Sequence, residues 1–167
     1  MNTALQHRGP DGEGIFISKD EKVLFGHRRL SIVDVQKGSQ PFVVNYNGFS
    51  YALTYNGEIY NHKEIKKELE ERGHVFKTNS DTEVLLRSYI EWKEQCLYRL
   101  NGQFAFVLYD GKEEKVFLAR DRVGIKPLYY TTLENGSFVF SSEPKGILVH
   151  PDFKKEPDYE TVADFFL

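Results

Sequence analysis

The chain has 167 residues, 40% of them hydrophobic, and a formal net charge of −3, which suits one domain with a hydrophobic core and excludes the broad basic field that attracts nucleic acid. No apolar run approaches the roughly 20 residues that span a bilayer, the first residues lack the apolar segment of a secretory signal, and a single cysteine excludes a disulfide framework. We therefore expect a cytoplasmic protein that binds no nucleic acid, no membrane and, for want of cysteine ligands, no structural zinc.

The first part of the chain is predicted to form a hairpin after a glycine-rich loop. Residues 7–14, with the sequence HRGPDGEG, contain two glycine turns around Pro10 and indicate a fixed loop. Strands are predicted at Glu13–Ser18 and Val23–Arg28, and a further short strand at Pro41–Asn45.

The stretch in which a predicted strand is followed within a few residues by a helix is the main candidate for a functional site. Ser50–Tyr55 is predicted as a strand that breaks at Asn56 and Gly57, and a helix follows almost at once. At such a strand end an Asn amide and a Gly N–H can donate to a developing oxyanion, and the neighbouring Glu58 can hold an ammonium group. A plain turn is the alternative at this point, because Asn-Gly is the commonest hairpin-turn dipeptide.

Two helices are predicted next. The first is Lys63–Arg72, with Asn61 as its cap and Gly73 as a left-handed residue beyond its end. The second, residues 80–98, begins with the capping-box pattern SDTE, in which the serine accepts from the first turn and the glutamate reaches back.

The sheet is predicted to resume after the second helix. Residues 103–109 and 116–119 are apolar on both alternating faces, so we expect strands that are covered on both sides. A further strand pair is predicted at 128–130 and 137–141, followed by a short helix at 143–149. Helices between runs of strands indicate an α+β fold with stacked layers.

Six ordered motifs give the sequence a family resemblance. They are HRGPDGEG at 7–14, RRLSIVD at 28–34, YNGEIYN at 55–61, SDTE at 80–83, LNGQFAF at 100–106 and RDRVGIKPLYY at 120–130. Together they resemble the glutaminase domain of glutamine-hydrolysing asparagine synthetases, a class II glutamine amidotransferase. The resemblance implies the N-terminal-nucleophile fold, a four-layer αββα sandwich.

The resemblance also implies roles for the glutamine-binding residues. Arg29 would bind the α-carboxylate of glutamine, since a guanidinium matches a carboxylate bidentately, and backbone groups of Leu30 and Ile32 would line the same pocket. Asp81 would hold the α-ammonium together with Glu58. Compensation of the helix N-terminus is the structural alternative for Asp81, and both roles are compatible.

For catalysis, the resemblance implies an oxyanion hole made by Asn56 and the Gly57 N–H, because the tetrahedral intermediate of amide hydrolysis carries negative charge. Residues 120–130 have two interpretations. Asp121, Arg122 and Lys126 can form a buried ionic corner, which is the favoured one, or the stretch contacts a partner domain.

The sequence departs from the family at the nucleophile. The family uses a cysteine at the mature N-terminus, whose own amine acts as the base, so His7 and His27 are predicted to be structural. No such cysteine is present, which by analogy places about 30 residues and the first strand outside the sequence. Cys96, near the end of a helix, is expected to be a buried and inert thiol.

Three interpretations follow for the whole chain. The favoured one is an incomplete glutamine amidotransferase domain, residues 1–157, with residues 158–167 beginning a linker toward an absent C-terminal synthetase domain. That domain would use ATP and Mg²⁺, whereas the glutaminase domain needs no cofactor. The others are a non-catalytic glutamine-binding homologue and an interaction-only domain. The acceptor that receives the ammonia, and pairing as a homodimer, are left open.

Overall fold

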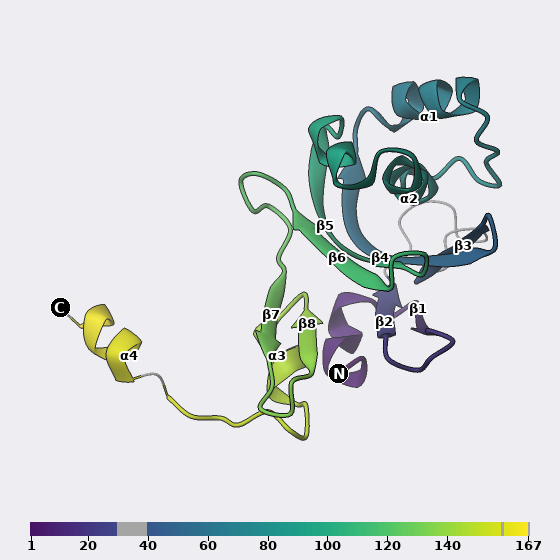
Figure 1. The fold of residues 1–167 in the computed structure, drawn as a ribbon. Helices are drawn as coiled ribbons and strands as arrows, with labels where there is room; N and C mark the ends of the chain where they lie inside the picture. The colour runs from purple at the N-terminus through teal and green to yellow at the C-terminus, as the bar shows by residue number, and fades with distance from the viewer. Residues whose placement is uncertain (30–39, 158, 167) are drawn as a thin grey trace.

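The computed structural model describes residues 1–29, 40–157 and 159–166. Leu30 and Ile32, two of the predicted pocket residues, lie outside the described residues. Mixed helices and antiparallel sheets confirm the expected α+β class (Figure 1). None of the described helices is long and apolar enough to cross a bilayer.

The centre of the fold is a four-stranded antiparallel sheet with the order β3-β4-β5-β6. Its strands are β3 (Phe42–Tyr46), β4 (Phe49–Ile59), β5 (Gly102–Asp110) and β6 (Lys115–Arg120). β4 and β5 pair along nine consecutive positions, from Tyr51 opposite Asp110 to Ile59 opposite Gly102. The two longest strands therefore form the middle of the sheet, where both faces are covered.

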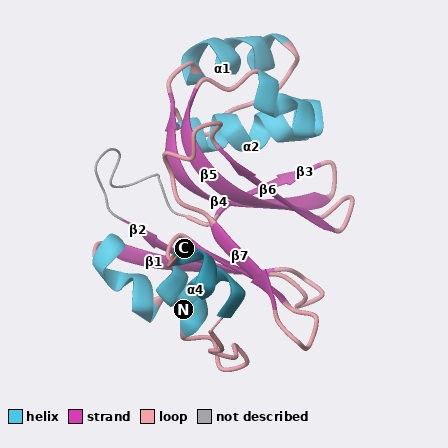
Figure 2. Cartoon of the chain, turned by 90° about the vertical axis from the view of Figure 1, so that its left-hand side faces the viewer, coloured by secondary structure: helices cyan, strands magenta, loops and turns pink. Residues whose placement is uncertain are grey.

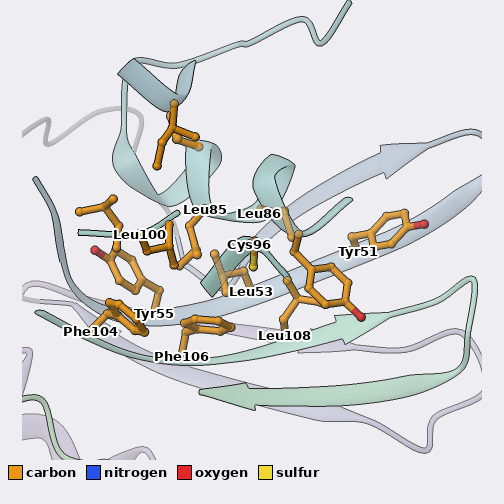
Figure 3. Packing of buried hydrophobic residues seen from close by; sticks show 14 of the residues in the cluster. Tyr51, Leu53, Tyr55, Leu85, Leu86, Cys96, Leu100, Phe104, Phe106 and Leu108 are labelled. Carbon is orange, nitrogen blue, oxygen red and sulfur yellow. The ribbon is translucent and has the colours of Figure 1, made fainter. Parts of the chain in front are cut away.

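Helices α1 (His62–Glu71) and α2 (Asp81–Trp92) cover one face of this sheet (Figure 1). Between them and the sheet lies the main hydrophobic core, in which leucine, tyrosine and phenylalanine side chains of β4, β5 and α2 interlock (Figure 3). The short 3₁₀ helix η2 (Lys93–Tyr98) adds Cys96 to the same core.

Two hairpins lie on the opposite face of the sheet. They are β1 (Gly12–Ile17) with β2 (Leu24–Arg29), and β7 (Tyr129–Thr132) with β8 (Phe138–Ser141). A second cluster of buried residues fills the space between the hairpins and the sheet: Phe25, Ala52, Val107 and Tyr109. Helices η1 (Thr3–Arg8) and α3 (Pro144–Leu148) contact each other, η1 also contacts strand β2, and α3 also contacts strand β8. Figure 2 shows α1 and α2 on one side of the four-stranded sheet and β1, β2 and β7 on the other. The order helix, sheet, hairpins, helix is that of the expected αββα sandwich.

An apolar cleft of about 320 Å³ separates the two hairpins. Phe25 of β2 and Phe140 of β8 meet edge to face with ring centroids 5.6 Å apart, and Val116 and Leu118 of β6 also line the cleft. Among the described strands, β2 pairs only with β1, and β8 only with β7. Among the described residues, the two hairpins of the second layer therefore do not pair with each other.

The predicted end of the central strand is wrong. β4 does not break at Asn56 and Gly57 but continues to Ile59, because β5 pairs with it along this whole stretch. Asn-Gly forms a turn only where the chain reverses direction, and here Gly57 lies opposite Phe104 in a continuous ladder.

Two helix predictions also need correction. The second α-helix ends at Trp92, because Lys93 has a φ of 53°, and the chain continues to Tyr98 as a 3₁₀ helix. Asn61 precedes α1, but its side chain pairs with the backbone of Arg99 and Asn101 rather than with the helix. Gly73 has the predicted left-handed conformation, with a φ of 92°.

The capping box at the start of α2 is half confirmed. Ser80 Oγ accepts a hydrogen bond from Glu83 N, at 3.3 Å. The Glu83 carboxylate does not reach back to Ser80 but accepts from the backbone N–H groups of Lys77 and Thr78. Arg87 donates to the same carboxylate at 2.8 Å, so this buried charge is fully paired.

The expectation that two strands are covered on both faces is confirmed for β5 and wrong for β6. Residues Phe104–Asp110 of β5 are buried, whereas residues of β6 between Lys115 and Ala119 are half-buried. β6 is the last strand of its sheet among the described residues, so its outer side lacks a neighbouring strand.

Last, helix α4 (Tyr159–Phe165) forms within the stretch predicted to begin a linker, and it lies apart from the rest of the chain in Figure 1. It has no buried residue.

Candidate functional site

In the C-terminal half of β4, the backbone N–H and C=O groups point alternately toward β5 and toward the opposite edge of the strand. Tyr60 N donates to Asn101 O at 2.8 Å, and Gly111 N donates to Ser50 O at 3.0 Å. Antiparallel ladders alternate, so the even-numbered residues of β4 exchange hydrogen bonds with β5 and the odd-numbered ones face the opposite edge. Gly57 therefore points its N–H away from β5, toward the side occupied by β3.

β3 ends before it reaches Gly57. Its pairing with β4 stops at Phe42 opposite Leu53, so the later odd-numbered N–H groups of β4 need other partners. Tyr55 N donates to Gln40 Oε1 at 2.7 Å. Ile59 N donates to Asp81 Oδ2 at 3.0 Å.

The Gly57 N–H thus lies between two side chains that bind the same strand edge. Alternate N–H groups along a strand are about 7 Å apart, so it lies one such step from the group that binds Gln40 and one from the group that binds Asp81. Glycine is required here by space as well, because a Cβ on Gly57 would collide with Gln103 O and come 2.8 Å from the Cα of Phe104.

Asp81, the first residue of α2, is fixed by β4. Tyr55 Oη donates to Asp81 Oδ2 at 2.6 Å, and the Ile59 N–H bonds the same oxygen. Asp81 Oδ1 has no hydrogen-bond partner within the described residues. Burial, followed by the Asp81 charge and hydrogen bond, raises the pKa of Tyr55 far above its usual value, so the phenol remains a donor. The fold therefore holds this carboxylate through one of its two oxygens among the described residues.

Arg29 comes to the site from the other layer. His27 Nδ1 and Thr54 Oγ1 lie 3.0 Å apart, which places β2 against the hairpin-facing side of β4. Side chains alternate along both strands, so Arg29, two residues after His27, is on the same face of β2, and Asn56, two residues after Thr54, is on the same face of β4. Arg29 and Asn56 thus lie on the faces of β2 and β4 that the contact between His27 and Thr54 joins.

His27 is neutral at physiological pH. Burial, followed by the nearby charge of Arg29, lowers its pKa to about 4. Its ring contacts a threonine hydroxyl that joins two layers, which agrees with the structural role predicted from the sequence. His7 is also engaged in a contact between elements, with its Nε2 3.0 Å from Glu143 Oε1.

Among the predicted site residues, Glu58 is the one whose position agrees least with its predicted role of holding an ammonium group together with Asp81. It is exposed and lies opposite Gln103, with its side chain on the hairpin-facing side of β4. Asp81 bonds the strand edge instead, and no contact joins the two carboxylates within the described residues. The structure therefore places Asn56, Gly57 and the Asp81 carboxylate at one end of β4, with Arg29 on the neighbouring strand β2, and leaves Glu58 exposed.

Cys96 lacks the properties of a nucleophile. It lies inside the main core, among leucine and aromatic side chains (Figure 3), with no exposed surface. Burial, followed by the charge of Glu94, raises its pKa to about 12, so the thiolate that a nucleophile needs does not form. The described residues also contain no group of three His, Cys, Asp or Glu side chains suited to a metal ion.

The predicted ionic corner at 120–130 is wrong, because the carboxylate of Asp121 pairs with backbone N–H groups and not with the side chains of Arg122 and Lys126. Asp121 is buried, but its carboxylate accepts from the backbone N–H groups of Phe104, Ile125 and Lys126. Arg122 is exposed. Burial alone would raise the pKa of Asp121, and these backbone hydrogen bonds together lower it below its usual value. Backbone donors thus stabilise the charge that the sequence interpretation assigned to Arg and Lys side chains.

Sequence reasoning missed Gln40 and Tyr55. Both bind the edge of β4 or the Asp81 carboxylate, yet neither residue type indicates a role by itself. The only available signal was that Tyr55 directly precedes Asn56 and Gly57. Its connection to Asp81, 26 residues away, depends on the packing of α2 against β4.

Comparisons with known proteins identify the family of the chain. The profile of the glutamine amidotransferase domain matches residues 1–167. Asparagine synthetase [glutamine-hydrolyzing] 3 of Bacillus subtilis (strain 168) is 49% identical over 99% of this chain and 26% of its own length. Asparagine synthetase B [glutamine-hydrolyzing] of Escherichia coli (strain K12) is 40% identical over 89% of this chain and 26% of its own.

A solved structure shows the same fold. Glutamine phosphoribosylpyrophosphate amidotransferase from B. subtilis, complexed with ADP and GMP, superimposes with a TM-score of 0.73 and 27% identity over 89% of this chain and 39% of that one. The present chain spans about a quarter of the length of the synthetase relatives.

Proposed function

The chain belongs to the glutamine amidotransferase domain family, and on this premise we propose that it is the glutaminase part of a glutamine-hydrolysing asparagine synthetase. In this proposal the domain releases ammonia from glutamine, and a synthetase part of the same protein uses it to amidate aspartate with ATP and Mg²⁺. The glutaminase part needs no cofactor, and residues 158–167 begin the connection to the synthetase part.

The observation that carries the proposal is the edge of β4. Along the edge of β4, the Gly57 N–H lies one step from a carboxylate that, among the described residues, is fixed through only one of its oxygens. That combination suits an amino acid whose ammonium group binds Asp81 while an oxygen elsewhere in the molecule approaches the Gly57 N–H. Arg29 and Asn56, carried on facing strands, supply a cation and an amide for the remaining polar groups.

The chemical roles follow from these positions. Glutamine binds with its α-carboxylate on Arg29 and its α-ammonium on Asp81 Oδ1, with Glu58 contributing negative charge at the rim. Its side-chain carbonyl oxygen becomes negative when the nucleophile attacks, and Asn56 and the Gly57 N–H stabilise that charge. A backbone N–H fixed in a sheet does so without reorganising. Leu30 and Ile32 would complete the pocket.

The nucleophile of this reaction is not among the 167 residues, whose one cysteine is buried Cys96. In the complete protein, a cysteine would form a γ-glutamyl thioester as ammonia leaves, and water would then release glutamate. The chain by itself is expected not to hydrolyse glutamine. That same observation favours a second candidate, a module that binds glutamine without hydrolysing it.

A single charge-removing substitution tests the proposal in the full-length protein. Asp81→Asn keeps an oxygen that can accept from Tyr55 and Ile59, but it removes the negative charge offered to the substrate ammonium. We expect the KM for glutamine to rise about tenfold or more, as loss of a charged contact does. Asparagine formation from added ammonia should remain unchanged.

The outcomes separate the candidates. Equal loss of glutamine-dependent and ammonia-dependent synthesis would mean that Asp81 acts on folding and not on glutamine. An unchanged KM would leave Asp81 a helix-capping residue only. A full-length protein that binds glutamine but releases no glutamate would support the non-catalytic candidate.

A further inference from the structure

Gln40, which precedes β3, places its side chain on the same edge of β4 as Asp81. The last pair between β3 and β4 is Phe42 opposite Leu53, and the same register would set Gln40 opposite Tyr55. If the ladder continued, Tyr55 N would therefore donate to the backbone carbonyl of Gln40. The side-chain carbonyl of the same residue takes this position instead, and its Oε1 accepts from Tyr55 N at 2.7 Å.

The backbone carbonyl of Gln40 is directed to the other layer of the fold. A Cβ on Gly14 of β1 would collide with Gln40 O and lie 3.2 Å from the Cδ of Pro41, so a glycine is needed for this close approach. Gly14 lies opposite His27 in the ladder between β1 and β2. Gln40 thus bridges the two layers, with its backbone against β1 and its side chain bound to β4.

Two side chains from different elements consequently hold β4 on either side of Gly57. Gln40 Oε1 binds Tyr55 N, and Asp81 Oδ2 binds Ile59 N. These N–H groups and that of Gly57 follow one another at steps of about 7 Å along the strand. A backbone N–H that loses its acceptor turns toward another one, and the adjoining peptide planes rotate with it. The direction of the Gly57 N–H therefore depends on both contacts.

We propose that Gln40 is a positioning residue for the oxyanion hole, which acts through the backbone of β4 and not on glutamine directly. Its side-chain amide continues the ladder beyond the end of β3 and so fixes the direction of the Gly57 N–H. This inference rests on the proposed function and adds a residue to its chemical step.

The two side chains on this edge differ in the step that they affect. Asp81 binds the ammonium group of glutamine, which is present before and during the reaction. The Gly57 N–H binds an oxygen that becomes negative only as the nucleophile attacks, so Gln40 affects mainly the transition state. The competing interpretation is that Gln40 only joins the two layers and contributes to stability.

The first test keeps the length of the side chain and removes its carbonyl acceptor. In the full-length protein, Gln40→Met should lower kcat for glutamine hydrolysis about tenfold, which is less than the roughly 100-fold or greater cost of deleting an oxyanion donor. The KM for glutamine should stay within about twofold of the wild type. Gln95→Met, at an exposed position of η2, is the matched control and should change neither constant. A raised KM with unchanged kcat, or no change in either constant, would overturn the proposal.

An analogue of the tetrahedral intermediate separates positioning from a loss of folded protein. The γ-aldehyde of glutamate is attacked by the nucleophilic thiol of the complete protein: the sulfur bonds the carbonyl carbon, the π electrons move to the oxygen, and the thiol proton passes to the N-terminal amine. The product glutamate forms no such adduct. Inhibition constants do not depend on the fraction of protein that is folded, so they compare the two ligands in the same active molecules.

We expect the inhibition constant of the aldehyde to rise about tenfold in Gln40→Met, in parallel with the fall in kcat, and that of glutamate to stay within about twofold. Equal changes for the two inhibitors would assign Gln40 to glutamine binding or stability and would contradict the proposal. Gln40→Asn serves if the methionine variant does not fold, because its amide is one methylene too short to reach Tyr55 N but remains polar. It should show the same difference between the inhibitors, and equal inhibition constants would again overturn the proposal.

The proposed function and this inference fail separately. If the wild-type full-length protein releases no glutamate, the proposed function is wrong. The NMR chemical shift of the Gly57 amide, measured with isotope-labelled glycine, still reports whether Gln40 sets its direction. That shift should move in Gln40→Met and not in Gln95→Met, and an unmoved shift would overturn the inference on Gln40.

Discussion

The phenol hydroxyl of Tyr55 donates a 2.6 Å hydrogen bond to Oδ2 of Asp81 and so joins the central strand to the first residue of helix α2. The same oxygen accepts from the N–H of Ile59 on the other side of Gly57. One carboxylate oxygen is thus fixed from two points of β4 that flank the candidate oxyanion donor. The position of Asp81 relative to Gly57 is set by this pair of contacts.

Removal of the phenol oxygen should therefore weaken glutamine binding without touching the substrate. In the full-length protein, Tyr55→Phe is expected to raise the KM for glutamine about tenfold, since a hydrogen bond to a charged group contributes about 1.5 kcal/mol. The matched control is Tyr89→Phe, which removes the 3.1 Å bond from another buried tyrosine to Asp110. If both variants changed the KM equally, Tyr55 would be a stability residue only.

Gly57→Ala should be far more harmful than a glycine substitution in open space. The added Cβ would meet Gln103 O and lie 2.8 Å from both the Phe104 Cα and the Tyr55 Cε2, so two central strands must separate. We expect a loss of about 1–3 kcal/mol in the free energy of unfolding and the loss of glutaminase activity. Gly12→Ala is the control, because nothing lies within 4 Å of a Cβ there. Urea unfolding of both variants decides the comparison.

The stability of the domain should depend on His27 between about pH 4 and 6.5. Its pKa is about 4 in the folded state against 6.5 in the unfolded chain, so the unfolded state binds more protons in this range. The stabilising contribution is complete above pH 6.5 and is lost as the pH falls toward 4.

The measurement is thermal unfolding of the wild type and His27→Gln at several pH values. Carboxylates with lowered pKa, such as Asp110, reduce the stability of both proteins in acid, so the difference between the two isolates His27. That difference should shrink as the pH is lowered below 6.5. A difference that stays constant from pH 7 to 4.5 would contradict the assigned pKa.

The open cleft between β2 and β8 predicts self-association of the 167-residue chain. Among its described residues, one edge of β2 and one of β8 have no partner strand, and an apolar cleft is lined by Phe25, Phe138 and Phe140; such edges pair with other chains. Sedimentation velocity should show oligomers that increase with concentration. Phe138→Lys should reduce them, and Val75→Lys, outside the cleft, should not. A monomeric chain with a single sharp transition at high temperature would count against this prediction.

Local features of the sequence predicted many of the elements. The hairpin of β1 and β2 lies within one residue of its predicted strands, and Gly73 ends α1 as a left-handed residue. These succeed because turn residues, alternation and helix caps act over a few neighbouring positions. The predicted break at Asn56 failed for the same reason, since the partner that extends β4 is Ala105, 49 residues later.

By itself, the sequence determined the family resemblance, the helix N-terminus at Ser80 and the residue types that glutamine chemistry needs. Only the tertiary structure decided how they meet. The ladder between β4 and β5 turns the Gly57 N–H to the opposite edge of β4, beyond the end of its pairing with β3, and the packing of α2 brings Asp81 to the same edge. Such placements depend on hydrogen bonds between residues distant in the chain, whose register is set by the buried faces of the sheet and not by local preference.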